Sequence, residues 1–444
     1  METLIKIAQL LLSLSILVIL HEFGHFSFAK LFKTKVEKFY LFFNPWFSVF
    51  KKKVGETEYG IGWIPLGGYV KIAGMIDESM DKEQMKQPPQ PWEFRSKPAW
   101  QRLFIMIGGV LMNFILAGII YIGVLYVWGE EYLPTNNVKF GISVDSAAYK
   151  IGFRDGDKIL SVNNKTFERF NELKKEMVLS SEKNVQILRN GEKKVIDIDD
   201  KSTLKVSKRN FIQPRFKFAI AGFAPKSNAQ IAGLQKDDKL IGINDSSLIF
   251  FDQFSHYFKI HKNSSVNLKI NRHGNILTLP VKIDSSGMIG VAVKPFADLE
   301  FKHQDYSFFA SIPAGILKGI ELTKDYLRSF KLIFNSETKA YKSVGSFVTI
   351  GNMFPGVWDW QAFWSMTAFL SIILAVVNLL PIPALDGGHV IFVLYEMITR
   401  RKPSDKFMEY AQITGFVILL AIMVLALKND FVNFNLWDKF LSLF

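Results

Sequence analysis

The sequence predicts an α-helical multi-pass membrane protein with about four membrane-spanning helices, a membrane-associated β-hairpin and two small mixed α/β domains. Three observations lead to this fold class. Long apolar runs with almost no charge lie near both ends of the chain, whereas the middle has the composition of a soluble protein. The middle contains an internal repeat. The stretch after the first apolar run alternates in the manner of β-structure.

Four apolar runs are long enough to cross a bilayer. A run of about 18 or more apolar residues predicts a span, because a helix satisfies its own backbone polar groups inside hydrocarbon. Glu22 is the only formal charge in the first run from Ile7 to Ala29, the second run has none, and the third has none until Asp386. The predicted spans are residues 1–30, 103–128, 361–391 and 409–428. Residues 1–20 could instead form a signal peptide, but no small-residue cleavage pattern follows them.

Basic residues in the short loops predict the orientation of these spans. They follow the first span, precede the second, and lie between the third and fourth. Short loops rich in Lys and Arg stay in the cytoplasm, so both termini and the long middle segment are expected outside. The net charge of +13 accompanies no recognisable nucleic-acid module, and we therefore expect lipid and not nucleic acid as a partner.

The middle segment contains two copies of one pattern. Residues 146–164 align with residues 227–245 at a constant offset that pairs Asp157 with Asp238. A helix-like stretch and a strand–turn–strand pattern follow each copy. Both copies resemble the core motif of PDZ domains, which implies domains at 138–206 and 216–296 and binding of an extended peptide as an added strand. Spacers or filters without a ligand are an equal alternative.

Two further segments have their own patterns. Residues 31–102 link the first two spans and include the alternating stretch, which predicts a β-hairpin that enters the membrane or stays in the cytoplasm. Residues 307–334 are apolar but interrupted by charges at helical spacing, which predicts an amphipathic helix on the membrane surface.

The first span carries an H-E-x-x-H motif, His21-Glu22-Phe23-Gly24-His25. Positions four residues apart lie about one helical turn apart, so both imidazoles leave the same face and can bind one Zn²⁺. Glu22, beside the first ligand, can take a proton from a water that the metal activates. Ionisable side chains inside an apolar helix are costly unless partnered, which favours a functional cluster over chance.

A third metal ligand must come from elsewhere in the chain. The chain has no Cys, so the ligand must be His, Asp or Glu. Asp386 is the best candidate because it closes an apolar run broken by two prolines and followed by two glycines. His389 is an alternative ligand, and on its own Asp386 could simply cap a helix.

These motifs together resemble the bacterial site-2 proteases, specifically the regulator of sigma-E protease type, over nearly the whole chain. HEFGH in the first span, the distal N-x-x-P-x-P-x-L-D-G-G-H that starts at Asn378, and the tandem PDZ-like copies between them carry the resemblance. It implies a zinc metalloendopeptidase with His21, His25 and Asp386 as ligands and Glu22 as general base. Asn378 would hold the substrate or the developing oxyanion, although a helix–helix hydrogen bond could explain this residue as well.

The resemblance also implies a substrate and a location. The substrate would be the transmembrane segment of a single-pass protein, such as an anti-sigma factor or a signal-peptide remnant, already shortened outside by a site-1-type protease. The hairpin, with Gly67, Gly68 and Tyr69, would clamp it as an added strand. The protein would lie in a bacterial inner membrane, with the PDZ-like domains on the periplasmic side and the active site near the cytoplasmic face.

The chain departs from the family pattern at two places. Phe42-Phe43-Asn44-Pro45 stands where relatives often have Gly-Phe-Gly, and Gly108-Gly109-Val110 replaces a small-Gly-Pro sequence, although Asn113-Phe114 is retained. A non-catalytic membrane scaffold with peptide-binding PDZ-like domains predicts no zinc and no need for Glu22. A zinc transporter would need further polar residues in the second and fourth spans, which lack them.

Overall fold

The computed structural model describes residues 1–75, 87–180, 183–206 and 210–434, so part of the predicted 31–102 and 138–206 segments lies outside the described residues. The described chain divides into two compact units. The helical unit contains Met1–Gly129, Asp305–Lys331 and the chain from Tyr341 onward, and the repeat unit contains Glu130–Gln304 and Leu332–Ala340. Each unit is described by itself below.

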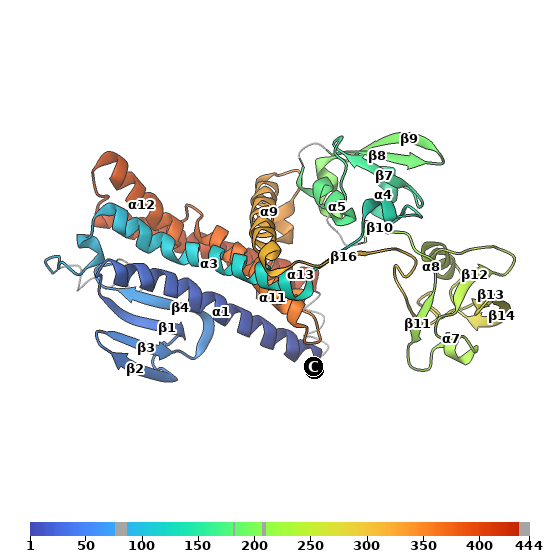
Figure 1. Cartoon of the computed structure of the whole chain (residues 1–444), viewed down its shortest axis with the longest axis horizontal. Coiled ribbons are helices and arrows are strands. Elements are labelled where there is room, and N and C mark those ends of the chain that lie inside the picture. Colours follow the sequence, from blue (N-terminus) through green and yellow to red (C-terminus); the bar gives the residue numbers. More distant parts are fainter. Residues whose placement is uncertain (76–86, 181–182, 207–209, 435–444) are drawn as a thin grey trace. The chain divides into compact units, whose positions relative to one another are not determined.

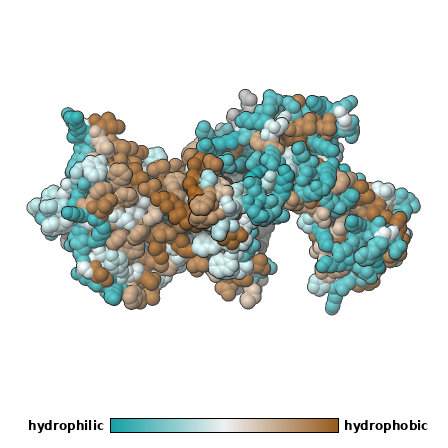
Figure 2. All heavy atoms as spheres, in the orientation of Figure 1, coloured by the Kyte–Doolittle hydropathy of each residue, from teal (hydrophilic) through white to brown (hydrophobic). Residues whose placement is uncertain are grey.

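The helical unit contains four helices that are long and apolar enough to cross a membrane: α1, α3, α11 and most of α13. Figure 2 shows hydrophobic residues over much of this unit, whereas hydrophilic residues cover most of the visible face of the repeat unit. The protein is therefore a membrane protein. The helices of this unit are α1 (Glu2–Leu31), α3 (Ala99–Trp128), α9 (Phe308–Phe334) up to Lys331, α10 (Phe347–Met353), α11 (Trp360–Asn378), α12 (Asp386–Thr399) and α13 (Asp405–Asn433), with a short 3-10 turn at Phe94–Ser96 and most of another at Ala340–Ser343.

Helix α3 lies at the centre of this unit and packs against α1, α11 and α12 (Figure 1). Glycines let α1 and α3 approach closely, because a Cβ atom on Gly24 would lie 2.2 Å from the backbone oxygen of Gly108. Close backbone approach through small residues is the usual way that membrane helices associate. Helix α9 contacts the same central helix through Gly315, whose added Cβ would lie 2.6 Å from the backbone nitrogen of Ile122.

The predicted third span is not one helix. Helix α11 ends at Asn378, and α12 begins only at Asp386. Pro381 and Pro383 lie between them and cannot donate backbone hydrogen bonds, so the helix is interrupted there. As a consequence, Asp386 lies in the first turn of a new helix and not along the side of a span.

Helix α13 packs against the segment between α11 and α12. A Cβ atom on Gly415 would lie 1.6 Å from the backbone oxygen of Pro383, so only glycine fits at this position. Near the other end of α13, the buried Asp430 carboxylate accepts hydrogen bonds from Ser346 and Thr349 at the start of α10. Helix α13 is thus attached to its unit both at Gly415 and at Asp430.

A four-stranded sheet follows α1, in the order β2-β3-β1-β4. Its strands are β1 (Val36–Phe43), β2 (Phe50–Val54), β3 (Thr57–Ile61) and β4 (Ile64–Ile72). β1 pairs antiparallel with β4 and parallel with β3, so the alternating stretch forms a four-stranded sheet. β4 is one of the two edge strands and runs along α1 (Figure 1), where a Cβ atom on Gly68 would lie 2.7 Å from Val18. This contact leaves no room for a side chain between sheet and helix.

The repeat unit contains two copies of one arrangement. In each copy a short helix, a strand, a second helix and a β-hairpin follow one another. Both hairpin turns, at Asn190-Gly191 and His273-Gly274, have positive φ at their two central residues, as this tight turn requires. The first copy contains β6 (Ile142–Val144), α4 (Ser146–Ile151), β7 (Lys158–Val162), α5 (Phe170–Leu179), β8 (Asn184–Arg189), β9 (Glu192–Asp197), α6 (Thr203–Val206) and β10 (Ile212–Pro214), and β5 (Glu130–Tyr132) precedes it. The second contains β11 (Ile220–Phe223), α7 (Asn228–Ile231), β12 (Lys239–Ile243), α8 (Phe251–Ile260), β13 (Ser265–Arg272), β14 (Asn275–Lys282) and β15 (Val291–Val293), and β16 (Lys302–Gln304) follows it.

An Asp–Arg pair recurs in both copies. Asp157 accepts two hydrogen bonds from Arg189, each 2.7 Å long, and Asp238 accepts two 2.8 Å hydrogen bonds from Arg272. Burial raises the pKa of Asp238, but the hydrogen bonds and charge of Arg272 outweigh this and leave the pKa below its usual value. The aligned aspartates of the sequence repeat therefore hold equivalent places in the two copies.

Candidate metal centre

Two imidazoles project from one face of α1. His21 and His25 are both buried, and their ring centroids lie 4.9 Å apart. The Nε2 atoms of the two rings approach to 3.3 Å. The i, i+4 spacing of the motif produces this arrangement, because four residues exceed one helical turn only slightly.

Glycine on α3 provides the space for both rings. A Cβ atom on Gly109 would lie 2.4 Å from Nε2 of His25 and 2.7 Å from Cε1 of His21. Any side chain there would therefore displace the imidazoles. In the sequence, Gly108-Gly109-Val110 replaces the small-Gly-Pro sequence of the family, but the sequence does not show that Gly109 faces the histidines.

The carboxylate of Asp386 meets the two imidazoles. Its Oδ2 atom lies 3.2 Å from Nε2 of His21 and 3.3 Å from Nε2 of His25. This buried oxygen has no hydrogen-bond partner. The first turn of α12 thus brings a residue from the far end of the sequence against the two histidines of α1.

The three donor atoms fit one zinc ion. Zinc binds imidazole nitrogen and carboxylate oxygen at about 2.0–2.2 Å in tetrahedral geometry, which requires about 3.4 Å between ligand atoms. The separations of 3.2, 3.3 and 3.3 Å match three corners of such a tetrahedron. Three protein ligands and one open position are typical of catalytic zinc sites, whereas structural sites use four protein ligands. His21, His25 and Asp386 are the residues of the described chain that the structure brings together in this way.

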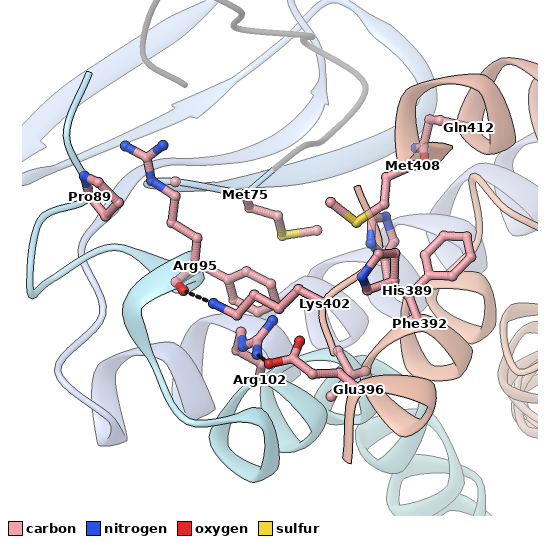
Figure 3. Close-up of a pocket in the computed structure, with 14 residues that line it drawn as sticks. Met75, Pro89, Arg95, Arg102, His389, Phe392, Glu396, Lys402, Met408 and Gln412 are labelled. Carbon is pink, nitrogen blue, oxygen red and sulfur yellow. Dashed lines mark hydrogen bonds and ion pairs between the residues drawn. The ribbon is translucent and has the colours of Figure 1, made fainter. Parts of the chain in front are cut away.

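His389 lies in another cavity of about 260 Å³ (Figure 3). There it accompanies Arg102, Glu396 and Lys402, and the Arg102 guanidinium forms a 2.5 Å ion pair with Glu396. The alternative metal ligand of the sequence therefore lines a different pocket from the three-residue cluster. Met75 lines this cavity and also the cavity beside His21, His25 and Asp386.

The cluster opens into a cavity of about 450 Å³ beside the edge strand of the sheet. Glu22 lines this cavity together with the two histidines and Asp386. β4 contributes Gly68 and Tyr69 to the wall, whereas Gly67 is not among the residues that line it. The cavity thus combines the metal cluster, a carboxylate that can act as a base, and a strand edge.

Tyr69 has a fixed orientation. Its hydroxyl donates a 2.8 Å hydrogen bond to Oδ1 of Asn44, and its ring stacks on Tyr40 with centroids 5.3 Å apart. Burial is the main cause that raises the pKa of Tyr69 to about 12, and the nearby Tyr40 and Glu58 add to it. The phenol therefore stays protonated at neutral pH and forms part of the cavity wall without carrying charge.

Two asparagines contact His21 from other helices. Asn378, the last residue of α11, places its Nδ2 atom 3.3 Å from Nε2 of His21. Asn113 of α3 places its Nδ2 atom 3.0 Å from Nδ1 of the same ring. The sequence pointed to Asn378 but assigned no role to Asn113, although an amide in a charge-free span is itself a signal of function.

Comparisons with known proteins find similar sequences over nearly the whole chain. The model of peptidase family M50 matches residues 9–422. A protein of Borreliella burgdorferi named as a zinc metalloprotease is 30% identical over 432 residues, which cover 94% of this chain and 96% of that protein. A protein of Haemophilus influenzae named regulator of sigma E protease is 27% identical over 469 residues, which cover 98% and 100%. A zinc metalloprotease, by name, of Rickettsia conorii is 28% identical over 438 residues, which cover 97% and 99%.

Proposed function

This chain belongs to peptidase family M50 and is a zinc-dependent metalloendopeptidase, and we propose that it cleaves peptide bonds within membrane-embedded segments through a site formed by His21, His25, Asp386 and Glu22. The observation that carries this proposal is the triangle of donor atoms with sides of 3.2–3.3 Å, in the same cavity as Glu22. His21 and His25 supply imidazole ligands, and Asp386 supplies the carboxylate. A zinc ion bound there lowers the pKa of water and polarises a scissile carbonyl.

Glu22 is the proton carrier of the proposed reaction. It follows His21 on α1 and lines the cavity, so its carboxylate can accept a proton from the attacking water. It then returns that proton to the leaving amine, because the nitrogen must be protonated before the peptide bond breaks. Asn378 can donate from its amide to the carbonyl oxygen as negative charge develops, since its Nδ2 atom lies at the rim of the metal cluster.

The edge of β4 suits an extended substrate. A transmembrane helix hides its carbonyls in its own hydrogen bonds, so the segment to be cut must first unwind. An edge strand has backbone donors and acceptors that a substrate strand can pair with. Gly68 and Tyr69 place this edge along the cavity that holds Glu22. We therefore assign β4 the role of substrate clamp, and we assign Gly67, within this strand at φ +154°, a conformational role.

The repeat unit and the membrane orientation complete the proposal. The two copies, 138–206 and 216–296, act as PDZ-like domains on the periplasmic side of a bacterial inner membrane. There they exclude intact proteins with bulky outer domains, so that a site-1-type protease must shorten the substrate first. The basic loops after the first span and before the fourth support a cytoplasmic position for the metal end of α1.

Zinc analysis combined with cleavage of a model transmembrane peptide tests the function. Purified wild type should contain about one zinc per chain and cut the peptide. Glu22→Gln should keep the zinc and lose about 10²- to 10⁴-fold in kcat, because only proton transfer is removed. Glu2→Gln, at the start of the same helix, is the matched control and should behave as wild type. Full activity of Glu22→Gln would contradict the proposed role of this residue.

A further inference from the structure

Asn113 is a buried amide in a membrane-spanning helix. It is fully buried in α3, and its side chain lies 3.0 Å from Nδ1 of His21. A buried amide in hydrocarbon is costly unless it is hydrogen-bonded. Because it contacts a ring of the metal cluster, it can influence which nitrogen of that ring carries the hydrogen.

Metal binding constrains which nitrogen of each imidazole carries hydrogen. Nε2 of His21 and Nε2 of His25 are the atoms that face the Asp386 carboxylate, so these nitrogens must offer lone pairs to a metal. In a neutral imidazole the hydrogen must then be on Nδ1, which needs an acceptor. Nδ1 of His25 lies 2.8 Å from the backbone oxygen of Ile105, and a carbonyl can only accept. His25 is therefore held in the tautomer that zinc requires.

The amide of Asn113 can accept a hydrogen bond from Nδ1–H of His21 in only one of its two orientations. Its oxygen can accept from Nδ1–H, whereas its NH₂ group would donate to Nδ1 and leave the hydrogen on Nε2. With the NH₂ group toward His21, the buried Oδ1 atom of Asn113 has no hydrogen-bond partner. The two orientations have the same shape, so turning the amide requires no other movement. The orientation with oxygen toward His21 frees Nε2 for the metal.

We propose that Asn113 is a positioning residue that accepts a hydrogen bond from Nδ1–H of His21 and thereby holds this ligand in its metal-binding tautomer. The hydroxyl of Ser371 on α11 donates a 2.8 Å hydrogen bond to the backbone oxygen of Asn113, so this part of α3 is fixed at the level of the cluster. The inference rests on the proposed zinc site and adds a residue that contacts no substrate.

Zinc affinity of the full chain in detergent tests this role, measured by competition with a chromophoric chelator. Asn113→Ala should weaken zinc binding by about 10- to 100-fold, as loss of such a partner does at other sites. Asn113→Asp keeps an acceptor and loses the donor, so it should bind zinc much more tightly than Asn113→Ala. The absorption spectrum of the Co²⁺-substituted protein should change in Asn113→Ala, because one ligand is no longer held in place.

Thr367→Val is the matched control. Thr367 and Ser13 form a buried 3.0 Å hydrogen bond between α11 and α1 that does not contact the cluster. Its loss should lower the melting temperature and leave zinc affinity unchanged.

Several outcomes would overturn the proposal. Wild-type affinity in Asn113→Ala would do so, as would an equal loss in Asn113→Asp and Asn113→Ala, which would make the amide a donor. An equal loss in Thr367→Val would assign the effect to helix packing. If Asn113→Asp does not fold, the comparison of Asn113→Ala with Thr367→Val tests the proposal: an equal loss of zinc affinity in the two variants would refute it. Zinc binding that survives His21→Ala would instead refute the proposed metal site, which distinguishes the two failures.

Discussion

Replacing Gly109 by alanine should weaken zinc binding although it changes none of the proposed ligands. The new Cβ atom would lie 2.4 Å from Nε2 of His25, about 1 Å short of ordinary van der Waals contact at 3.4 Å. Zinc sites tolerate ligand distances within about 0.2 Å of the ideal value, so a displacement of the rings by this amount should weaken zinc binding. Overpacking of this kind costs about 1–3 kcal/mol. If that strain opposes the metal-bound state, affinity falls about 5- to 150-fold.

A second glycine on the same helix provides the control for this experiment. A Cβ atom on Gly123 would meet nothing within 4 Å, so Gly123→Ala gains the same helix propensity without a clash. Zinc affinities of wild type, Gly109→Ala and Gly123→Ala are measured by competition with a chelator, and melting temperatures confirm folding. Equal zinc affinities in the two variants would refute the close contact between α3 and the histidines.

Three further predictions follow from other contacts. Asp386→Ala should weaken zinc binding by more than the roughly 10- to 100-fold typical of outer-shell changes, because it removes a proposed ligand; retained stoichiometric zinc after dialysis would contradict this. Gly68→Ala should push β4 away from α1 and lower peptide cleavage while zinc content stays constant, with Gly123→Ala as control; loss of zinc would mean that the sheet supports the cluster itself. The pKa of Asp238 is lowered in the folded state, so the stability that its pair with Arg272 provides is present above the unfolded pKa and is lost as pH falls below about 4. Asp238→Asn should destabilise the second copy by about 2 kcal/mol at pH 7 and flatten this pH dependence, as followed by hydrogen exchange of that copy; an unchanged pH profile would exclude the pair as its source.

The sequence pointed to the residues of the cluster more directly than to the structure around them. His21 and His25 follow from helical spacing alone, and Asp386 follows from the cost of a carboxylate at the end of an apolar run. The structure brings these three together. The prolines also explain why the third span ends at Asn378, although the sequence treated residues 361–391 as one element.

Other features could not be predicted because they depend on contacts between distant segments. Nothing local shows which face of the charge-free second span meets α1, so the roles of Gly109 and Asn113 were missed. Strand pairing is also a long-range property, and alternation alone cannot show that β1 lies between β3 and β4. A helix that contains charges could lie on a membrane or pack on another helix, and contacts such as that of Gly315 with α3 show that α9 packs on a helix.

The close packing of Pro383 against Gly415 has a consequence for biosynthesis. The segment that precedes Asp386 packs against α13, which is synthesised after it and contributes none of the three residues of the metal cluster. During translation, the earlier segments enter the bilayer while this support does not yet exist. We therefore expect hydrolytic activity to arise only once α13 has been synthesised and inserted, so that the nascent enzyme stays inert until then.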